Sequence, residues 1–595
     1  MQLTAVSTCI EITMRKSLHN LPQATSSDAI VHETLAPLTH GIALASITGA
    51  YLDWISHVAA SPDKQREMFE SAARKLAAWF RYVRESASGG CPPCTLPQPS
   101  DKRFADPAWA GIPFNWSSQA FLLVERWWEE AMTNVPGVSS HHEEVAEFVT
   151  RQWLDMLSPS NFVAFNPEVL RYTISTGGSN LIRGAINWQR DATDLLLQHK
   201  PRGTEAFVPG KSVALTPGKV IYQNHLIELI QYESMTKETY PEPVLIVPSW
   251  IMKYYILDLS PQNSLVRYLL ERGHTVLMIS WNNPAKGDRD LSLNDYLEMG
   301  VMSALQTIEK IAPGARIHAA GYCLGGTLLA IAAAALQRKR ANILASMTLL
   351  ASQLDFEEPG QLGLFIDESQ IAYLESIMSS QGYLDGPQMA GAFALINSKD
   401  LVWSKLVHEY LMGAQTPMTD LRAWNADATR MPYRMHSEYL RKFYLNNDLA
   451  EGRLLVDGKP IALKDLELPV FSVSTERDHV SPWRSAYKIH WLTECEITFV
   501  LASGGHNVGI VNPPQKNEYR SSSYRVARRA SGGEYIDPDS WLLAADLQQG
   551  SWWPEWQSWL AKRSSKKAAA LPISGTLALV SSDLEDAPGR YVHIT

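Results

Sequence analysis

The stretch Ala315–Leu336, ARIHAAGYCLGGTLLAIAAAAL, decides the fold of this chain. Residues 315–320 are predicted to form a strand, and residues 327–336 are typical of a helix. Between them stands Gly321-Tyr322-Cys323-Leu324-Gly325-Gly326. A turn this tight leaves space for almost no side chain beside its central residue, which explains the glycines and places Cys323 in strained backbone. The helix N-terminus below it favours a thiolate, so the pattern predicts a nucleophilic cysteine.

The segments around this turn predict the sheet that holds it. PVLIVP (243–248) and HTVLMISW (274–281) are short apolar runs typical of buried parallel strands, with a helical pattern between them. Strands that alternate with helices indicate a doubly wound α/β sheet. A G-x-C-x-G turn between strand and helix is then the nucleophile elbow of an α/β-hydrolase fold, with cysteine in place of serine and with Gly321 and Gly325 as the elbow glycines.

The partners of the nucleophile are predicted from their order along the chain. In this fold an acid and then a histidine follow the nucleophile. Asp478 follows the strand VFSVS (470–474), and His506 follows the strand ITFVLA (497–502), so Cys323, Asp478 and His506 fit that order. Asp355, after the strand SMTLLA, is the competing acid. His479 is the competing histidine, although it directly follows the acid.

A cysteine nucleophile points to a particular chemistry. When a thiolate attacks a thioester, the product is another thioester, so the acyl group stays activated on the enzyme. A serine ester would lose that activation. Cys323 therefore favours acyl transfer from a thioester such as an acyl-CoA, although cysteine hydrolases of this fold also exist. The backbone N–H of Leu324 is the predicted donor to the oxyanion.

Changes in pattern along the 595 residues predict four regions. Residues 1–27 form a disordered leader, and 28–212 form a mostly α-helical N-terminal domain with a linker near 86–100. Residues 213–562 form the catalytic domain, and 563–595 form a partly disordered C-terminal tail. Helical patterns without a clear strand at about 355–451 predict a cap inserted between two late strands, where it can cover the site.

Composition limits the partners of the protein. Lys and Arg number 53 against 62 Asp and Glu, and the net charge of −9 gives no electrostatic reason to expect a nucleic acid. Five scattered cysteines favour a reducing cytoplasm over a disulfide framework. We expect no signal peptide. We also expect no membrane span, because the best candidate for one, 41–55, is too short and contains Asp53. The 19 Trp indicate large aromatic surfaces, either buried or offered to something apolar.

Several long segments resemble one family, the polyhydroxyalkanoate synthases, in their class I-like form. The matching segments are RQWLDMLSPSN (151–161), VPSWIMKYYILD (247–258), DHVSPW (478–483), GHNVGIVNPP (505–514), GSWWPEW (550–556) and LEDAPGRYV (584–592). The resemblance extends from about residue 30 to the last residue. Where the family typically has Pro and Asn, this chain has Ser249 and Met252, and Asn397-Ser398 replace a commoner Arg-Pro.

The resemblance implies a polymerase that joins (R)-3-hydroxyacyl-CoA units into a polyester and releases CoA. Cys323 would carry the chain as a thioester and His506 would activate the thiol. Asp478 would orient His506 or help to deprotonate the 3-hydroxyl group. A second oxyanion N–H would come from Trp250 or Ile251, with the cap excluding water.

The resemblance also implies a homodimer that acts at the surface of cytoplasmic polyester granules without a separate subunit. Trp424 stands where the family has a tryptophan of the dimer interface, although a buried core position is equally compatible. No dinucleotide-binding motif or P-loop is present, so we expect no cofactor, and no metal either. Cys91-Pro-Pro-Cys94 lacks the second pair of ligands that a metal site needs. The alternatives are a cysteine acyl-CoA thioesterase and an inactive granule-associated binding protein.

Overall fold

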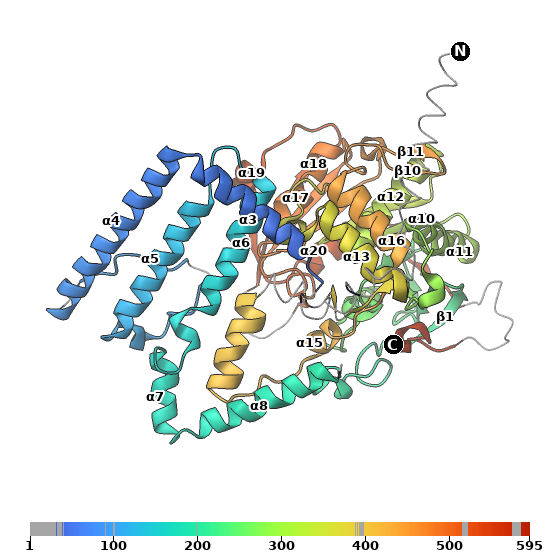
Figure 1. Cartoon of the computed structure of the whole chain (residues 1–595). Coiled ribbons are helices and arrows are strands. Elements are labelled where there is room, and N and C mark those ends of the chain that lie inside the picture. Colours follow the sequence, from blue (N-terminus) through green and yellow to red (C-terminus); the bar gives the residue numbers. More distant parts are fainter. Residues whose placement is uncertain are drawn as a thin grey trace, which may run out of the picture. The chain divides into compact units, whose positions relative to one another are not determined.

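The computed structural model describes residues 31, 39, 41–89, 91–98, 101–197, 199–386, 388–389, 391, 398–514, 522–573 and 585–595. The predicted leader, 1–27, lies outside these residues. The chain divides into two compact units. The catalytic unit contains Arg202–Met389 and Met418–Thr595, and the helical unit contains Thr39–Pro201 and Ala390–Pro417. Figure 1 colours both units along the sequence and labels some of their elements.

A ten-stranded sheet forms the centre of the catalytic unit, with the strand order β1-β2-β5-β4-β6-β7-β12-β13-β14-β15. Neighbouring strands from β5 to β13 pair in parallel, and the strands on either side pair antiparallel. The bounds are β1 Gly218–Gln223, β2 Ile227–Tyr232, β4 Val244–Val247, β5 Val276–Trp281, β6 Ile317–Tyr322, β7 Leu344–Leu350, β12 Val470–Thr475, β13 Ile497–Ala502, β14 Ser523–Arg529 and β15 Asp546–Gln549. The predicted α/β fold is confirmed.

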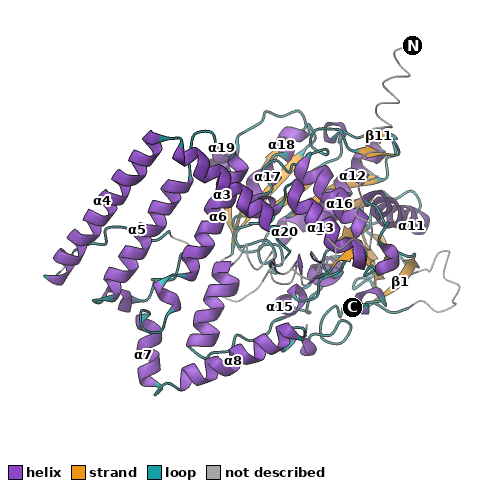
Figure 2. Cartoon of the chain, in the orientation of Figure 1, coloured by secondary structure: helices purple, strands orange, loops and turns teal. Residues whose placement is uncertain are grey.

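Helices bury the parallel strands on both faces, which is why these strands are continuously apolar. Helix α12 (Leu324–Arg338) packs on β6 and β7, and Figure 2 shows such helices in purple around the orange strands. Other helices of the sheet layers are α9 Leu265–Leu270, α10 Leu293–Asp295, α11 Ser303–Ile311, α17 Trp483–Tyr487, α18 Ile489–Leu492, α19 Pro538–Ala544 and α20 Trp553–Ala561.

Part of the tryptophan surplus lies under helix α20. Trp552 and Trp553 donate to the backbone oxygens of Gly509 and Ile510, at 2.9 and 3.0 Å. The other two members of the group, Trp556 and Trp559, donate to the hydroxyls of Thr348 and Thr498. All four are buried, and their indole N–H groups are satisfied by two strands of the sheet and by the turn that follows β13. These side chains therefore hold a helix on the core.

The insertion between β7 and β12 differs from the single cap predicted at 355–451. Its parts in the catalytic unit are α13 Glu368–Gln381, β8 Tyr383–Leu384, α15 Asp420–Asn425, β9 Met431–Pro432, α16 Tyr433–Tyr439 and a π-helical segment Leu440–Leu445. Residues 390–417 instead belong to the helical unit. There the side-chain amide of Asn187 donates to the backbone oxygens of Glu409 and Ala414, both at 3.1 Å, and so holds this segment on α8.

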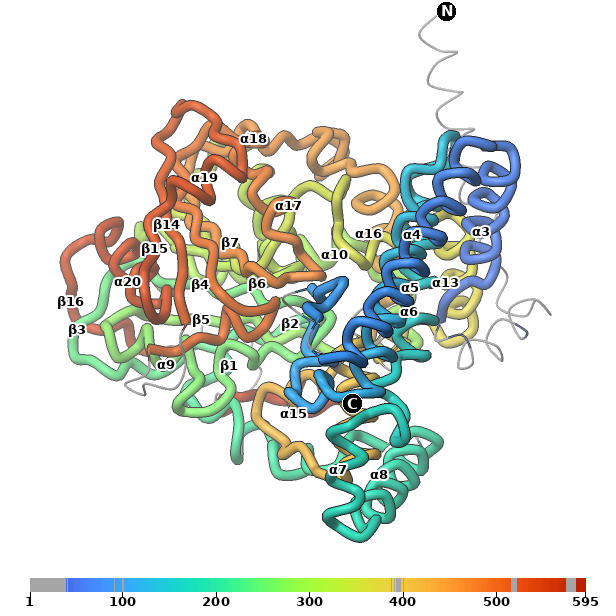
Figure 3. The backbone as a smooth tube through the Cα atoms, turned by 90° about the vertical axis from the view of Figure 1, so that its left-hand side faces the viewer, coloured from blue at the N-terminus to red at the C-terminus, as the bar shows by residue number. Residues whose placement is uncertain are grey.

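The helical unit contains α3 Leu44–Ala59, α4 Pro62–Ala87, α5 Phe114–Met132, α6 Ser140–Met156, α7 Pro167–Ser175 and α8 Ser179–Leu196. Helices α3 to α6 lie side by side, as the blue and cyan tubes of Figure 3 show. The first part of the unit ends at Pro201, whereas the predicted boundary is residue 212. Within the predicted linker, residues 91–98 form neither helix nor strand.

The predicted tail is partly built into the catalytic unit. Ala568–Ala569 forms a strand, β16, against β3 (Glu238–Thr239). The backbone N–H of Val220 on β1 donates to the oxygen of Glu585 at 2.9 Å, and that of Ala587 donates back to Gly218 at 2.9 Å. The described part of the tail is therefore ordered. Within the described residues, no helix is both long and apolar enough to cross a membrane.

Candidate active site

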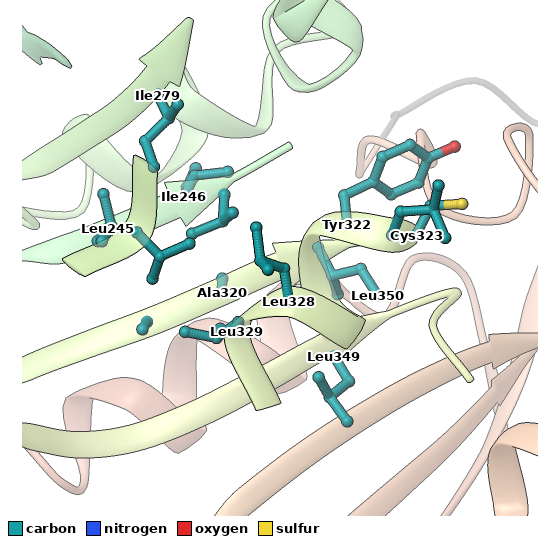
Figure 4. Close-up of a cluster of buried hydrophobic side chains, with 14 of the residues drawn as sticks. Leu245, Ile246, Ile279, Ala320, Tyr322, Cys323, Leu328, Leu329, Leu349 and Leu350 are labelled. Atoms are coloured by element: carbon teal, nitrogen blue, oxygen red, sulfur yellow. The ribbon is translucent and has the colours of Figure 1, made fainter. Parts of the chain in front are cut away.

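The backbone around Cys323 adopts a conformation that side chains rarely take. Its φ is 51° and its ψ is −124°, at the junction of β6 and α12. The N–H of Cys323 donates to the oxygen of Leu350 at 2.8 Å, and the Cys323 oxygen accepts from the hydroxyl of Ser352 at 2.8 Å. Figure 4 shows Cys323 beside Tyr322 at the end of the buried cluster. Contacts to β7 and the residues after it thus hold the strained residue in place.

The two elbow glycines occupy positions without room for a side chain. A Cβ atom on Gly321 would lie 2.3 Å from the Cα of Gly326, and a Cβ on Gly325 would lie 2.1 Å from the oxygen of Val247. Both obstacles are backbone atoms, which cannot rotate away. The glycines are therefore required by the close approach of α12 to β6 and β4.

The structure brings Cys323, Asp478 and His506 together. The Nδ1 atom of His506 lies 2.7 Å from Oδ2 of Asp478, and the electrostatic influence of Cys323 on the same ring contributes to the raised pKa of His506. The other carboxylate oxygen of Asp478 accepts the N–H groups of Val480 and Ser481, at 2.9 and 2.8 Å. Asp478 is thereby fixed by its own loop, and it fixes the ring that faces the thiol.

The charges in this arrangement favour the protonated imidazole. Burial alone would lower the pKa of His506, but the carboxylate of Asp478 and the sulfur of Cys323 together hold that pKa well above its usual range. Cys323 is only 9% exposed, so little water screens these interactions. The site can therefore stabilise an imidazolium next to a thiolate.

The competing residues lie in different surroundings. The carboxylate of Asp355 is 3.5 Å from the ammonium of Lys488 and 3.3 Å from the amide of Asn447. The side chain of His479 points outward and is exposed. Because neither residue takes the place beside His506 or Cys323, the geometry favours Asp478 and His506 as the partners of the thiol.

The loop Trp250–Lys253, which contains the predicted oxyanion donors Trp250 and Ile251, is held by a second segment. The N–H of Thr429 donates to the oxygen of Ile251 at 3.0 Å, and its hydroxyl donates to the oxygen of Trp250. The indole N–H of Trp424 donates to the oxygen of Lys253 at 2.7 Å. Trp424 is only 3% exposed within the single chain, so it packs in the core of the catalytic unit.

The first turn of α12 supplies the other predicted donor. Leu324 is the first residue of that helix, and the first N–H groups of a helix have no partner within it. Met252, one of the departures from the family pattern, forms a bridge with Ala428. Of the other departures, Ser249 is buried, Ser398 donates to the side-chain oxygen of Gln152, and Asn397 lies outside the described residues.

Two tyrosines of the insertion also belong to the site, and the sequence analysis missed them. The hydroxyls of Tyr439 and Tyr444 lie 3.3 Å apart. Burial raises the pKa of both hydroxyls, and the electrostatic influence of Cys323 acts in the same direction. Trp250 packs edge-on against Tyr439, with ring centres 6.2 Å apart. Only the aromatic spacing in this segment could have suggested them, and such spacing is also typical of an ordinary core.

Cys91 and Cys94 form no shared site. The Cys91 thiol contacts the carboxylate of Glu85 at 3.4 Å, whereas the Cys94 thiol contacts the side-chain oxygen of Gln119 at 3.0 Å. Burial raises the pKa of both thiols. Over the described part of the chain, no group of three or more His, Cys, Asp or Glu side chains could hold a metal ion.

Comparison with known proteins shows close relatives over most of the chain. A poly(3-hydroxyalkanoate) polymerase of Methylorubrum extorquens is 40% identical over 90% of this chain and 87% of its own length. The poly(3-hydroxyalkanoate) polymerase subunits PhaC of Rhizobium etli and Cupriavidus necator are 36% and 34% identical, over 97% and 91% of this chain and over 91% and 90% of their own lengths. A solved monoacylglycerol lipase of Paleococcus ferrophilus covers 47% of this chain and 90% of its own at 11% identity, with a TM-score of 0.30, too low to carry an argument.

Profiles of known families match the N-terminal part of the chain and the catalytic unit separately. The alpha/beta hydrolase fold profile matches residues 242–513, which contain the elbow, Asp478 and His506, so the catalytic unit is an α/β-hydrolase domain. The profiles of the poly-beta-hydroxybutyrate polymerase N terminal and of the poly-beta-hydroxybutyrate polymerase (PhaC) N-terminus match residues 22–64 and 100–269. The chain therefore belongs to the poly(3-hydroxyalkanoate) polymerase family, which confirms the family predicted from its motifs.

Proposed function

We propose that this protein polymerises (R)-3-hydroxyacyl-CoA into a polyester, with Cys323 as the residue that carries the acyl chain. The observation that supports this most strongly is the strained Cys323 at the turn between β6 and α12, together with His506, whose Nδ1 lies 2.7 Å from the carboxylate of Asp478 and whose pKa Cys323 helps to raise. The names of the relatives support the same activity.

The first half of the reaction loads the cysteine. His506 takes the thiol proton, and the thiolate of Cys323 attacks the carbonyl carbon of the acyl-CoA. The carbon–sulfur bond to CoA then breaks, and CoA leaves with the proton that His506 returns. The negative oxygen formed during attack would be held by the N–H of Leu324 and by one from the loop at Trp250 and Ile251.

The second half lengthens the chain. The 3-hydroxyl of an incoming hydroxyacyl-CoA loses its proton to His506 or, in the alternative that stays open, to Asp478. Its oxygen attacks the thioester on Cys323, forming an oxoester and releasing the thiol, which takes the proton. The lengthened chain, now a CoA thioester, returns to Cys323 by the first step. No cofactor or metal enters this scheme.

Exclusion of water decides between a polymerase and a thioesterase. The low exposure of Cys323 and the aromatic side chains around it support polymerisation. We extend the proposal to a homodimer that works at the surface of polyester granules in the cytoplasm, on the basis of family membership. The apolar polyester gives a use to the exposed aromatic and aliphatic side chains of the chain.

The experiment uses the purified full-length chain and 3-hydroxybutyryl-CoA. Released CoA is measured with a thiol reagent, and polymer is measured by precipitation and gas chromatography. We expect equal amounts of CoA and polymerised units, and a loss of both by at least about 10³-fold in Cys323→Ala. Free acid in place of polymer would identify a thioesterase. Undiminished polymer from Cys323→Ala would contradict the proposal.

A further inference from the structure

A buried ammonium group connects the oxyanion loop to a segment more than 300 residues away in the chain. Lys253, the last residue of that loop, is 3% exposed. Its Nζ donates to the backbone oxygens of Tyr591 at 3.0 Å and Ile594 at 2.7 Å. A lysine is seldom buried, because removing its charge from water is costly unless strong acceptors replace the water. The carbonyl groups of residues 591 and 594 are such acceptors.

A second link joins the same segment to the other side of the loop. The side-chain amide of Asn283 donates to the oxygen of Ile594 at 3.2 Å, and its oxygen accepts the N–H of Arg430 at 2.8 Å. Arg430 directly follows Thr429, whose hydrogen bonds hold the oxygens of Trp250 and Ile251. The oxygen of Ile594 therefore accepts from two side chains. Lys253 belongs to the loop itself, and Asn283 is connected to the loop through Arg430 and Thr429.

The segment is anchored at a point away from the loop. Glu228 on β2 is fully buried, and its carboxylate accepts the backbone N–H groups of Arg590 and Tyr591 at 3.1 and 3.0 Å. Gly589 precedes them with a φ of 77°, and a Cβ there would lie 2.4 Å from the carboxylate. The anchor therefore needs the carboxyl oxygen of Glu228 as an acceptor and a glycine at position 589.

We propose that the segment Glu585–Thr595 is a positioning element of the acyl-transfer site. Anchored at Glu228, it holds the ammonium of Lys253, and Lys253 holds the loop Trp250–Lys253 at the place where the acyl oxygen becomes negative. Without the segment, the ammonium of Lys253 loses its two carbonyl acceptors and has to move toward water. Because Lys253 is part of the loop Trp250–Lys253, the loop then moves with it. This inference rests on the proposed function, because it gives that loop a role in acyl transfer. Lys253 acts through the loop and does not touch the reacting atoms.

The test separates the reactivity of the thiol from the transfer of the acyl group. Alkylation of Cys323 by iodoacetamide needs the thiol and His506 but no oxyanion donor, whereas acylation by 3-hydroxybutyryl-CoA needs all of them. We expect Lys253→Met to lower kcat by roughly 10-fold to 100-fold with KM within about 2-fold, while the alkylation rate stays within about 2-fold of the wild type. Lys253→Arg, which can still donate to both carbonyl groups, should recover most of kcat.

A variant at the anchor tests the same link from its other end. Gly589→Ala leaves Lys253 and the loop unchanged but places a methyl group against Glu228, so we expect the same fall in kcat. The two substitutions together should cost little more than either alone, because they break one connection. Lys219→Met is the matched control: its ammonium contacts Asp586 of the same segment at the surface, and we expect kcat to stay within about 2-fold.

Three results would overturn the proposal: unchanged kcat in Gly589→Ala, equal losses of alkylation and acylation in the soluble variants, or additive losses in the double variant. If Lys253→Met does not fold, Gly589→Ala and Lys253→Arg decide the question. Failure of the proposed function itself is recognised separately, since Cys323→Ala would then retain polymer synthesis in the same assays.

Discussion

At the residue scale, conformation and chemistry are coupled at Cys323. A side chain at a φ of 51° is costly, and the cost is met by the contacts of its backbone with Leu350 and Ser352. The same conformation lifts the thiol out of the turn toward the ring of His506. The strain is therefore the means by which a buried sulfur reaches its base.

The His506–Asp478 pair makes stability depend on pH in a definite direction. The pKa of His506 in the folded state lies well above the value of about 6.5 of an unfolded chain, so the folded state binds this proton more tightly. The resulting stabilisation is fully present below about pH 6.5 and is lost as the pH rises through the raised pKa. Each pKa unit corresponds to about 1.4 kcal/mol.

We therefore expect Asp478→Asn to destabilise the catalytic unit more at pH 6 than at pH 9. Urea unfolding followed by hydrogen exchange in β12 and β13 measures the difference between variant and wild type at each pH. A difference that is constant, or that grows toward pH 9, would contradict the assigned origin of the shift. His479→Gln, at an exposed position of the same loop, serves as the control.

At the element scale, β6 and α12 can meet only because the glycines of the turn between them have no side chains. The Cβ of an alanine at position 325 would lie 2.1 Å from the oxygen of Val247 and 2.6 Å from that of Pro248, both on the neighbouring strand and its exit. The helix would have to move away from the sheet as a whole. The turn thus fixes the distance between two layers of the fold.

Gly325→Ala should therefore destabilise the catalytic unit by about 3 kcal/mol or more, since overpacking against backbone relaxes poorly. Denaturant midpoints and soluble yield are the measurements. Gly287→Ala is the matched control, because a Cβ there meets no atom within 4 Å. A loss in Gly325→Ala no larger than in that control would contradict the close packing of the turn.

At the scale of the whole molecule, the chain forms two units with separate cores. In the helical unit, Arg103 is paired with Asp101, Glu125 and Asp155, at 2.5, 2.9 and 2.8 Å. Asp155 is only 2% exposed, and burial raises the pKa of its carboxyl group. One guanidinium group thus pairs with three carboxylates, and the ammonium of Lys399 lies 4.0 Å from the carboxylate of Asp155.

Arg103→Met should destabilise the helical unit by about 3–5 kcal/mol, because it leaves buried carboxylates without that partner. Hydrogen exchange measured by mass spectrometry should show lost protection in α5 and α6, with β6 and β12 unchanged. Arg66→Met, which removes only exposed ion pairs, should leave both regions as they are. Equal loss of protection in both units would contradict separate cores.

The sequence predicts those features of the fold and of the site that depend on residues close together in the chain. The turn at Cys323, the strands before Asp478 and His506 and the buried apolar runs all follow from local spacing, and the structure agrees with them. Contacts between residues that are far apart in the chain cannot be predicted from local spacing. The contact of Asp355 with Lys488 and the assignment of 390–417 to the helical unit are tertiary properties that no local pattern encodes.

The placement of Glu585–Thr595 along β1 also affects how copies of the protein meet. Strand β1 is the last strand on its side of the sheet, and an uncovered edge offers unpaired N–H and carbonyl groups to any other strand. The bonds of Glu585 and Ala587 to Val220 and Gly218 occupy part of that edge. The segment therefore protects part of this edge from strand-to-strand aggregation with another copy of the protein.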